Sequence, residues 1–223
     1  PGVDALVELR GELADAHETF VREYGLGLVG GCCGTTPEHL RHVVERVRGV
    51  PVQTRTPSPE PGISSLYQPV RFDQDVTYLS IGERTNANGS KAFREAMLEQ
   101  RWDDCVRIAR EQARDGAHVL DLCVDYVGRD GVADMSTLAG MFATASTLPI
   151  VLDSTEPEVL RAGLERLGGR CIVNSVNLED GGANLDRVCR LARRHGAAVV
   201  ALVIHEGGMA MTVDDKLATA RRI

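Results

Sequence analysis

Two adjacent cysteines, Cys32 and Cys33, lie in a glycine-rich stretch before a predicted helix. Neighbouring side chains of an extended strand point to opposite faces, so adjacent thiols can share one centre only where the backbone turns sharply. Three glycines allow such a turn: Gly30, Gly31 and Gly34. A thiolate pair suits zinc, which takes three or four protein ligands, so Cys32 and Cys33 would supply two of them. The alternative is a buried or disulfide-bonded pair.

A second group of polar residues follows five apolar runs in the later part of the chain. Because carboxylates accept paired N–H donors and amides both donate and accept, this set suits a neutral, donor-rich ring such as a pterin. Alternatively, Asp153, Ser154 and Thr155 could cap the helix that begins near Pro157. The residues, in chain order, are Glu83 and Asn86, Asp121 and Asp125, Asp153 and Ser154, Asn174 and Ser175, and His205 and Glu206.

The elements that position this second group alternate regularly between strand and helix. Short, continuously apolar runs are typical of a parallel sheet buried on both faces. We expect five strands at residues 77–82, 118–124, 149–153, 171–175 and 197–204, with helices between them. The carboxyl ends of such strands form one rim, in a (β/α)8 barrel as in an open sheet. No G-x-G-x-x-G and no P-loop follows the first strand, which removes the usual argument for a dinucleotide site.

The first part of the chain is predicted to form a helix over 4–24 and a short strand at 26–29. The cysteine turn follows, and then a second helix that Thr36 caps, with Pro37 at its first position. This order fits the closing segment of an α/β domain. Residues 50–75 then hold five of the nine prolines, which resist regular structure, so they predict a linker. The expected division is therefore 1–49, linker 50–75, and 76–223.

Composition narrows the class of protein. The chain has 223 residues, 43% hydrophobic and 26% charged, and a net charge of -7, which argues against a nucleic-acid binder. No run of about 18 apolar residues and no signal peptide occurs, so we expect no membrane span and a cytoplasmic protein. The other four cysteines, which we expect to be small buried side chains, are Cys105, Cys123, Cys171 and Cys189. Because the chain starts without methionine and ends within a helical pattern, we expect it to be a piece of a longer polypeptide.

Four motifs together resemble the cobalamin-dependent methionine synthases, the 5-methyltetrahydrofolate–homocysteine methyltransferases. Gly-Gly-Cys-Cys-Gly-Thr-Thr-Pro-Glu-His at 30–39 is similar to the zinc-binding end of their homocysteine-binding barrel, and Gly-Glu-Arg-Thr-Asn-Ala-Asn-Gly-Ser at 82–90 resembles the opening of their pterin-binding barrel. Val-Leu-Asp-Ser at 151–154 and Ile-Val-Asn-Ser at 172–175 resemble two further strand ends. The resemblance covers nearly the whole chain, and related pterin enzymes lack the cysteine segment.

The resemblance implies the last βα segment of one (β/α)8 barrel, a linker, and the first five βα units of a second. The full enzyme would move a methyl group from 5-methyltetrahydrofolate by way of cobalamin to zinc-bound homocysteine. Cys32 and Cys33 would bind zinc with a third cysteine upstream of Pro1. Cobalamin would be held by another region of the same polypeptide. The pterin-binding residues would be Asp153 and Asn174, with Glu83, Asn86 and Asp121 in the same pocket.

One position departs from the family pattern: His205 stands where the family more often has an acidic residue, so we expect a loop or helix-entry role for it. Two alternatives remain open. The chain could belong to another pterin enzyme, a methyltransferase to a corrinoid protein or a dihydropteroate synthase-like protein. The isolated segment could also be inert, because incomplete barrels leave open sheet edges.

Overall fold

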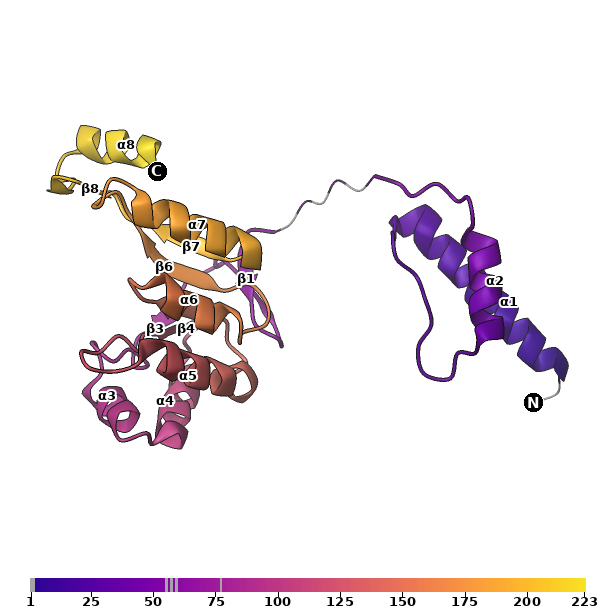
Figure 1. The fold of residues 1–223 in the computed structure, drawn as a ribbon, viewed down its shortest axis with the longest axis horizontal. Coiled ribbons are helices and arrows are strands. Elements are labelled where there is room, and N and C mark those ends of the chain that lie inside the picture. Colours follow the sequence, from indigo (N-terminus) through magenta and orange to yellow (C-terminus); the bar gives the residue numbers. More distant parts are fainter. Residues whose placement is uncertain (1–2, 55, 57, 59, 77) are drawn as a thin grey trace. The chain divides into compact units, whose positions relative to one another are not determined.

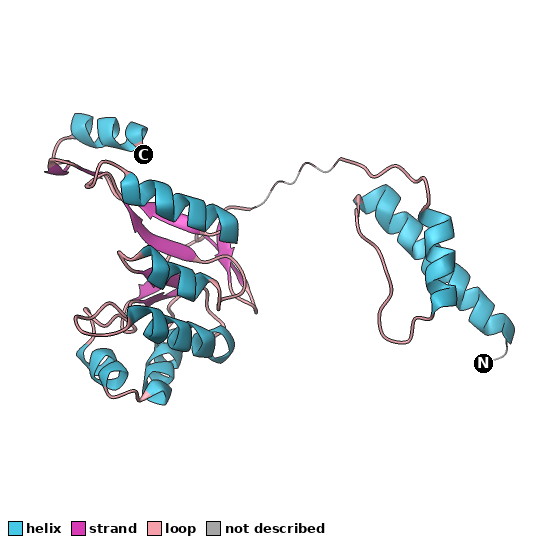
Figure 2. Cartoon of the chain, viewed as in Figure 1, coloured by secondary structure: helices cyan, strands magenta, loops and turns pink. Residues whose placement is uncertain are grey.

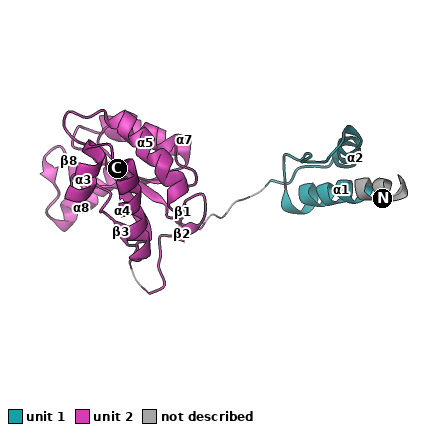
Figure 3. Ribbon diagram, turned by 90° about the horizontal axis from the view of Figure 1, so that it is seen from below, with its two compact units in different colours: residues 1–59 teal, residues 60–223 magenta. Residues whose placement is uncertain are grey.

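The computed structural model describes all residues except 1–2, 55, 57, 59 and 77, and it divides the chain into two compact units. Figure 3 colours these units, which cover Pro1–Pro59 and Glu60–Ile223. No described helix is long and apolar enough to cross a membrane.

The first unit is a pair of packed helices joined by the loop that carries the cysteines (Figure 1). Helix α1 runs over Val3–Tyr24 and α2 over Pro37–Val47, with Thr36 as the N-cap and Pro37 in the first turn, as predicted. Ala14, Val21 and Val43 are buried between them. The strand predicted at 26–29 does not form, because these residues have no neighbouring strand with which to pair among those described in this unit.

The second unit is built on a five-stranded parallel sheet in the order β3-β4-β5-β6-β7. Figure 2 colours the strands magenta and the helices cyan. The strands are β3 (Ile81–Gly82), β4 (Val119–Leu122), β5 (Ile150–Asp153), β6 (Ile172–Val176) and β7 (Ala198–Ala201). The helices between them are α3 (Lys91–Leu98), α4 (Trp102–Arg114), α5 (Gly131–Ala145), α6 (Pro157–Leu164) and α7 (Ala183–His195). Spatial order follows chain order without reversal, unlike a doubly wound sheet, so the parallel α/β prediction is confirmed.

Alternation along each strand gives the sheet two different faces. Leu120, Leu122, Leu152 and Val173 belong to the large core cluster that contains the buried residues of the helices. The intervening residues face the other way. Near the amino ends these are apolar: Val119, Val151 and Ile172 pack together with Ile63. Two residues further along the same strands come Asp121, Asp153 and Asn174. Polar groups thus lie at the carboxyl ends of this second face, above an apolar layer.

Residues 62–71 lie in the predicted linker but form an antiparallel hairpin of the second unit, with β1 (Gly62–Ser64) paired to β2 (Pro69–Arg71). The proline content misled the prediction, because a proline is tolerated at the first residue of an edge strand. Ile63 is 2% exposed and supplies the burial that stabilises the hairpin. Arg170, which precedes β6, holds the hairpin in place, because its Nη1 donates to the Gly62 carbonyl at 2.9 Å.

The chain after β7 turns back into a small hairpin, β8 (Ile204–His205) and β9 (Gly208–Met209), followed by α8 (Val213–Arg222). The predicted strand 197–204 is therefore shorter than expected. His205 accepts from the Gly207 N–H at Nδ1 (2.9 Å), and its Nε2 lies 3.2 Å from Asp215 at the start of α8. His205 therefore lies in a short strand and not in a loop, and its contact with Asp215 places it beside the start of α8.

Candidate functional site

The cysteine loop of the first unit is a tight turn with both thiols exposed. Cys32 and Cys33 are free, so the alternatives of a buried pair and of a disulfide are both wrong. The carbonyl of Cys32 accepts from the backbone N–H of Thr35 at 3.0 Å and from its hydroxyl at 2.6 Å. Two glycines are needed here: a side chain at Gly31 would collide with Thr35, and Gly34 has φ +82°.

A histidine fastens this loop to helix α1. The Nε2 atom of His17 lies 2.9 Å from the carbonyl oxygen of Gly30, and its Nδ1 atom lies 2.7 Å from that of Leu13. The donor chemistry of the two thiols fits part of a zinc site. Among the described residues, however, no group of three or more His, Cys, Asp or Glu side chains could hold a metal ion. The pair is thus at most two ligands of a larger set.

Polar residues of the second unit converge at the carboxyl ends of β4, β5 and β6. Asp153 and Asn174 pair in register on adjacent strands, and Nδ2 of Asn174 donates to Oδ1 of Asp153 at 3.2 Å. Asn86, from the loop after β3, donates from Nδ2 to Oδ2 of Asp121 at 2.8 Å and to Oδ2 of Asp153 at 3.0 Å. The structure therefore brings together four of the five predicted pterin-site residues: Asn86, Asp121, Asp153 and Asn174.

The fifth predicted residue, Glu83, is exposed and is linked to this cluster through the backbone and by its charge. Its carbonyl accepts from the Asn86 N–H at 3.2 Å, which closes the turn that presents Asn86. The loop is anchored further on by the Ala87 N–H, which donates to the Cys123 carbonyl at 2.9 Å. Thr85 is fully buried between these positions, where its hydroxyl donates to the carbonyl of Asp121.

Burial and mutual repulsion set the electrostatics of the cluster. Burial raises the pKa of Asp121 to about 6, and the negative charges of Asp153 and Glu83 add to the effect, while the hydrogen bond from Asn86 opposes it. The pKa of Asp153 is also raised, chiefly by burial, with the charges of Asp125 and Glu83 adding. The site therefore presents acidic oxygens and amides to a ligand.

Ser154 and Asp125 form a second connection beside the cluster. The Ser154 hydroxyl lies 2.8 and 2.9 Å from the carboxylate oxygens of Asp125 and also accepts from the Glu156 N–H at 3.1 Å. The N-cap of α6 is Glu156, with Pro157 following. None of Asp153, Ser154 and Thr155 caps this helix, so the capping alternative is wrong for all three.

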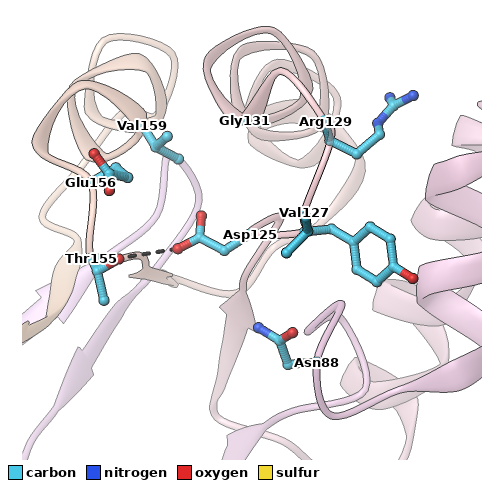
Figure 4. Close-up of a pocket in the computed structure, with 9 residues that line it drawn as sticks. Asn88, Asp125, Val127, Arg129, Gly131, Thr155, Glu156 and Val159 are labelled. Atoms are coloured by element: carbon cyan, nitrogen blue, oxygen red, sulfur yellow. Dashed lines mark hydrogen bonds between the residues drawn. The ribbon is translucent and has the colours of Figure 1, made fainter.

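A cleft of about 740 Å³ opens next to this connection, between the loop after β4 and the start of α6 (Figure 4). Asp125 points across it toward Thr155, whose N–H donates to Asp125 at 3.3 Å. Arg129 lies at the edge of the cleft, but its guanidinium is paired with Asp134 through two bonds of 2.8 and 2.6 Å. None of the five predicted pterin-site residues lines this cleft, so it is a neighbour of the cluster and not its cavity.

The remaining cysteines behave as predicted, with one exception. Cys105, Cys123 and Cys171 are buried, and burial raises their thiol pKa values to about 11, 12 and 11. Cys189 is exposed, contrary to expectation, because Val188 and Ala192 are the buried residues of α7. Cys123 was not predicted as a site residue, yet its thiol accepts from Asn88 Nδ2 at 3.7 Å and helps to lower the pKa of Asp153.

A family model described as "Pterin binding enzyme" matches residues 82–222, more than half of the chain. The chain belongs to the pterin-binding enzyme family. The cluster of Asp153 and Asn174 lies inside the matched region of this pterin-binding chain. A second family model, "Homocysteine S-methyltransferase", matches residues 6–47, which include both exposed cysteines.

Two curated relatives of this pterin-binding chain carry the name "Methionine synthase". The protein of Mycobacterium tuberculosis is 58% identical over 215 residues, and that of Mycobacterium leprae is 57% identical over 220 residues. Each match covers 95% of the chain but 18% of the relative. The chain thus spans less than a fifth of the length of the relatives that it matches.

Proposed function

We propose that this chain is the segment of a cobalamin-dependent methionine synthase that joins its two substrate-binding domains. One observation carries the proposal: a pterin-binding sheet and a segment matching homocysteine S-methyltransferases occur together in one chain. Another pterin enzyme would have no use for the second segment. The overall reaction would transfer a methyl group from 5-methyltetrahydrofolate to homocysteine by way of cobalamin, giving methionine and tetrahydrofolate in the cytoplasm.

In this proposal residues 1–49 are the end of the homocysteine-binding domain and residues 76–223 are the first part of the pterin-binding domain. Both domains would be (β/α)8 barrels. The sequential order of β3 to β7, with the helices packed on one face, supports five units of the second barrel. The hairpin 62–71 would close the amino end of that barrel, because Ile63 packs against the apolar layer inside it.

Asp153 and Asn174 would bind the pterin ring. A carboxylate has about four lone-pair positions, and Asn86 and Asn174 occupy one on each oxygen of Asp153. The remaining positions can accept two parallel N–H bonds from an amidine-like ring edge, a strong charge-assisted arrangement. Glu83, Asn86 and Asp121 would line the same pocket. The methylated ring nitrogen must be protonated before its bond to the methyl group breaks, and the acidic residues of the site could support that protonation.

Cys32 and Cys33 would be two of three zinc ligands, with the third outside this chain. The exposure of both thiols on a loop fixed by Thr35 and His17 supports this assignment. When bound, zinc would keep the homocysteine sulfur as a thiolate near neutral pH. The cobalamin would be held elsewhere in the polypeptide, and none of the residues described here is assigned to it.

The two half-reactions of the complete protein test this proposal. Purified protein is given 5-methyltetrahydrofolate and reduced cobalamin, and tetrahydrofolate is measured; it is then given homocysteine and a methylated cobalamin, and methionine is measured. We expect both products, with only the second lost after zinc is removed by a chelator. Tetrahydrofolate without methionine, whatever the metal content, would favour the alternative of a methyltransferase to a corrinoid protein.

A further inference from the structure

Both donors and both acceptor positions of the Asn86 side-chain amide are hydrogen-bonded to other groups of the protein. Its two N–H groups point at Asp121 and Asp153, at 2.8 and 3.0 Å. Its oxygen accepts from the backbone N–H groups of Asn88 and Gly89, at 2.9 and 3.0 Å. An asparagine amide has two donors and two acceptor lone pairs, so none is left for a ligand.

The orientation of this amide is fixed by its partners. A flipped amide would set its oxygen against two carboxylate oxygens and its NH2 group against two backbone N–H groups, losing four hydrogen bonds. Asn86 is also only 8% exposed, and its backbone N–H is bonded to the Glu83 carbonyl. The side chain therefore has one arrangement in which it can satisfy its surroundings.

We propose that Asn86 is a positioning residue, which holds the carboxylate of Asp153 in place for the pterin and does not itself contact the ring. The inference rests on the proposed folate-binding function and specifies how the site is built. Asp121, which is 3% exposed, is the second anchor, because it takes the other N–H of the same amide. The amide thus joins a buried carboxylate to the ligand-facing one.

The surroundings of Asp153 show what the loss of this bridge would change. The charged groups that act on it are all acidic: Asp121 on β4, Asp125 on the loop after β4, and Glu83 after β3. Asn86 and Asn174 donate to its two oxygens at 3.0 and 3.2 Å, and these hydrogen bonds, together with the nearby Cys123 thiol, favour its ionised form. Without Asn86 the Asp153 carboxylate should take up a proton at a higher pH. Once it is protonated, it can no longer accept the two parallel N–H bonds from the pterin.

The experiment measures the dissociation constant of 5-methyltetrahydrofolate between pH 5 and 8.5 in the complete protein. Three variants are compared with the unmodified protein: N86A, N174A, and the control N184A, whose side chain lies on α7. N86A should move the acidic midpoint of binding upward by about one pH unit and weaken binding at pH 8.5 by less than about tenfold. N174A should weaken binding across the whole range and move the midpoint less than N86A, because its hydrogen bond to Asp153 is longer, 3.2 against 3.0 Å, and N184A should do neither.

A uniform loss of affinity in N86A with an unmoved midpoint would overturn the inference, because that is the signature of a direct ligand contact. Circular dichroism checks the fold, and should N86A unfold, Asn86→Ser takes its place with one hydroxyl donor. A cycle with D121N is a second test: the two substitutions should be non-additive if Asn86 acts as a bridge, whereas additive effects would contradict it. If the unmodified protein binds no folate at any pH, the proposed function fails instead.

Discussion

Asn174 donates a hydrogen bond from Nδ2 to Oδ1 of Asp153 at 3.2 Å, although the two residues are 21 positions apart and lie on different strands. Parallel register between β5 and β6 creates this pair, since both residues follow apolar positions that pack in the same layer. The half-exposed amide also keeps an oxygen that can accept from a ring N–H.

Replacing Asn174 with alanine should weaken the binding of 5-methyltetrahydrofolate by about 1–3 kcal/mol, the usual cost of leaving a buried polar partner unpaired. Titration of the complete protein with folate measures this, and Asn184→Ala on α7 is the matched control. An affinity equal to that of the unmodified protein would remove Asn174 from the site.

The cysteine pair makes a separate prediction, because it belongs to the other unit. Replacing Cys32 or Cys33 with alanine should abolish zinc retention and the methylation of homocysteine, while demethylation of the folate continues at its normal rate. Metal analysis and the two half-reaction assays measure these effects. Cys189→Ala is the control, since Cys189 is also free and exposed but lies on α7. An unchanged zinc content in both loop variants would refute the ligand assignment.

Much of the sheet could be predicted from the sequence, because buried parallel strands are short, continuously apolar and followed by polar residues. Asp121, Asp153 and Asn174 were found in this way, from their places at or beside strand ends. The bridge through Asn86 could not be predicted, because the sequence does not say whether an amide after a strand faces a ligand or other side chains. The hairpin 62–71 was missed for a different reason: its apolar alternation, Ile63 with Val70 and Phe72, is short and lies among prolines.

Asp121 should make the stability of the pterin-binding unit depend on pH. Its pKa in the folded protein is raised to about 6 from an ordinary value of 3.8, so the folded state holds the proton more tightly than the unfolded state. Stability should therefore fall as pH rises from about 4 to about 6 and stay lower above that range. The difference between the two pKa values corresponds to about 3 kcal/mol as an upper figure.

The variant D121N tests that dependence, because it removes the charge and keeps a similar size. It should unfold at a higher denaturant concentration than the unmodified protein at pH 8, and the two midpoints should converge near pH 4. A gain in stability that is the same at both pH values would show that the ionisation of Asp121 is not its cause.

The last prediction concerns the hairpin β1–β2 and its anchor Ile63. Ile63 is 2% exposed and packs against Val119, Val151 and Ile172, so truncation to alanine leaves a cavity in that layer. We expect a loss of about 2–5 kcal/mol in the free energy of unfolding, measured by denaturant titration of the complete protein and followed in the pterin-binding unit. Val76→Ala is the control, because Val76 is 93% exposed in the nearby loop and its loss should change little. A loss below about 0.5 kcal/mol for Ile63→Ala, the scale of an ordinary surface substitution, would mean that residues 60–75 are a linker after all.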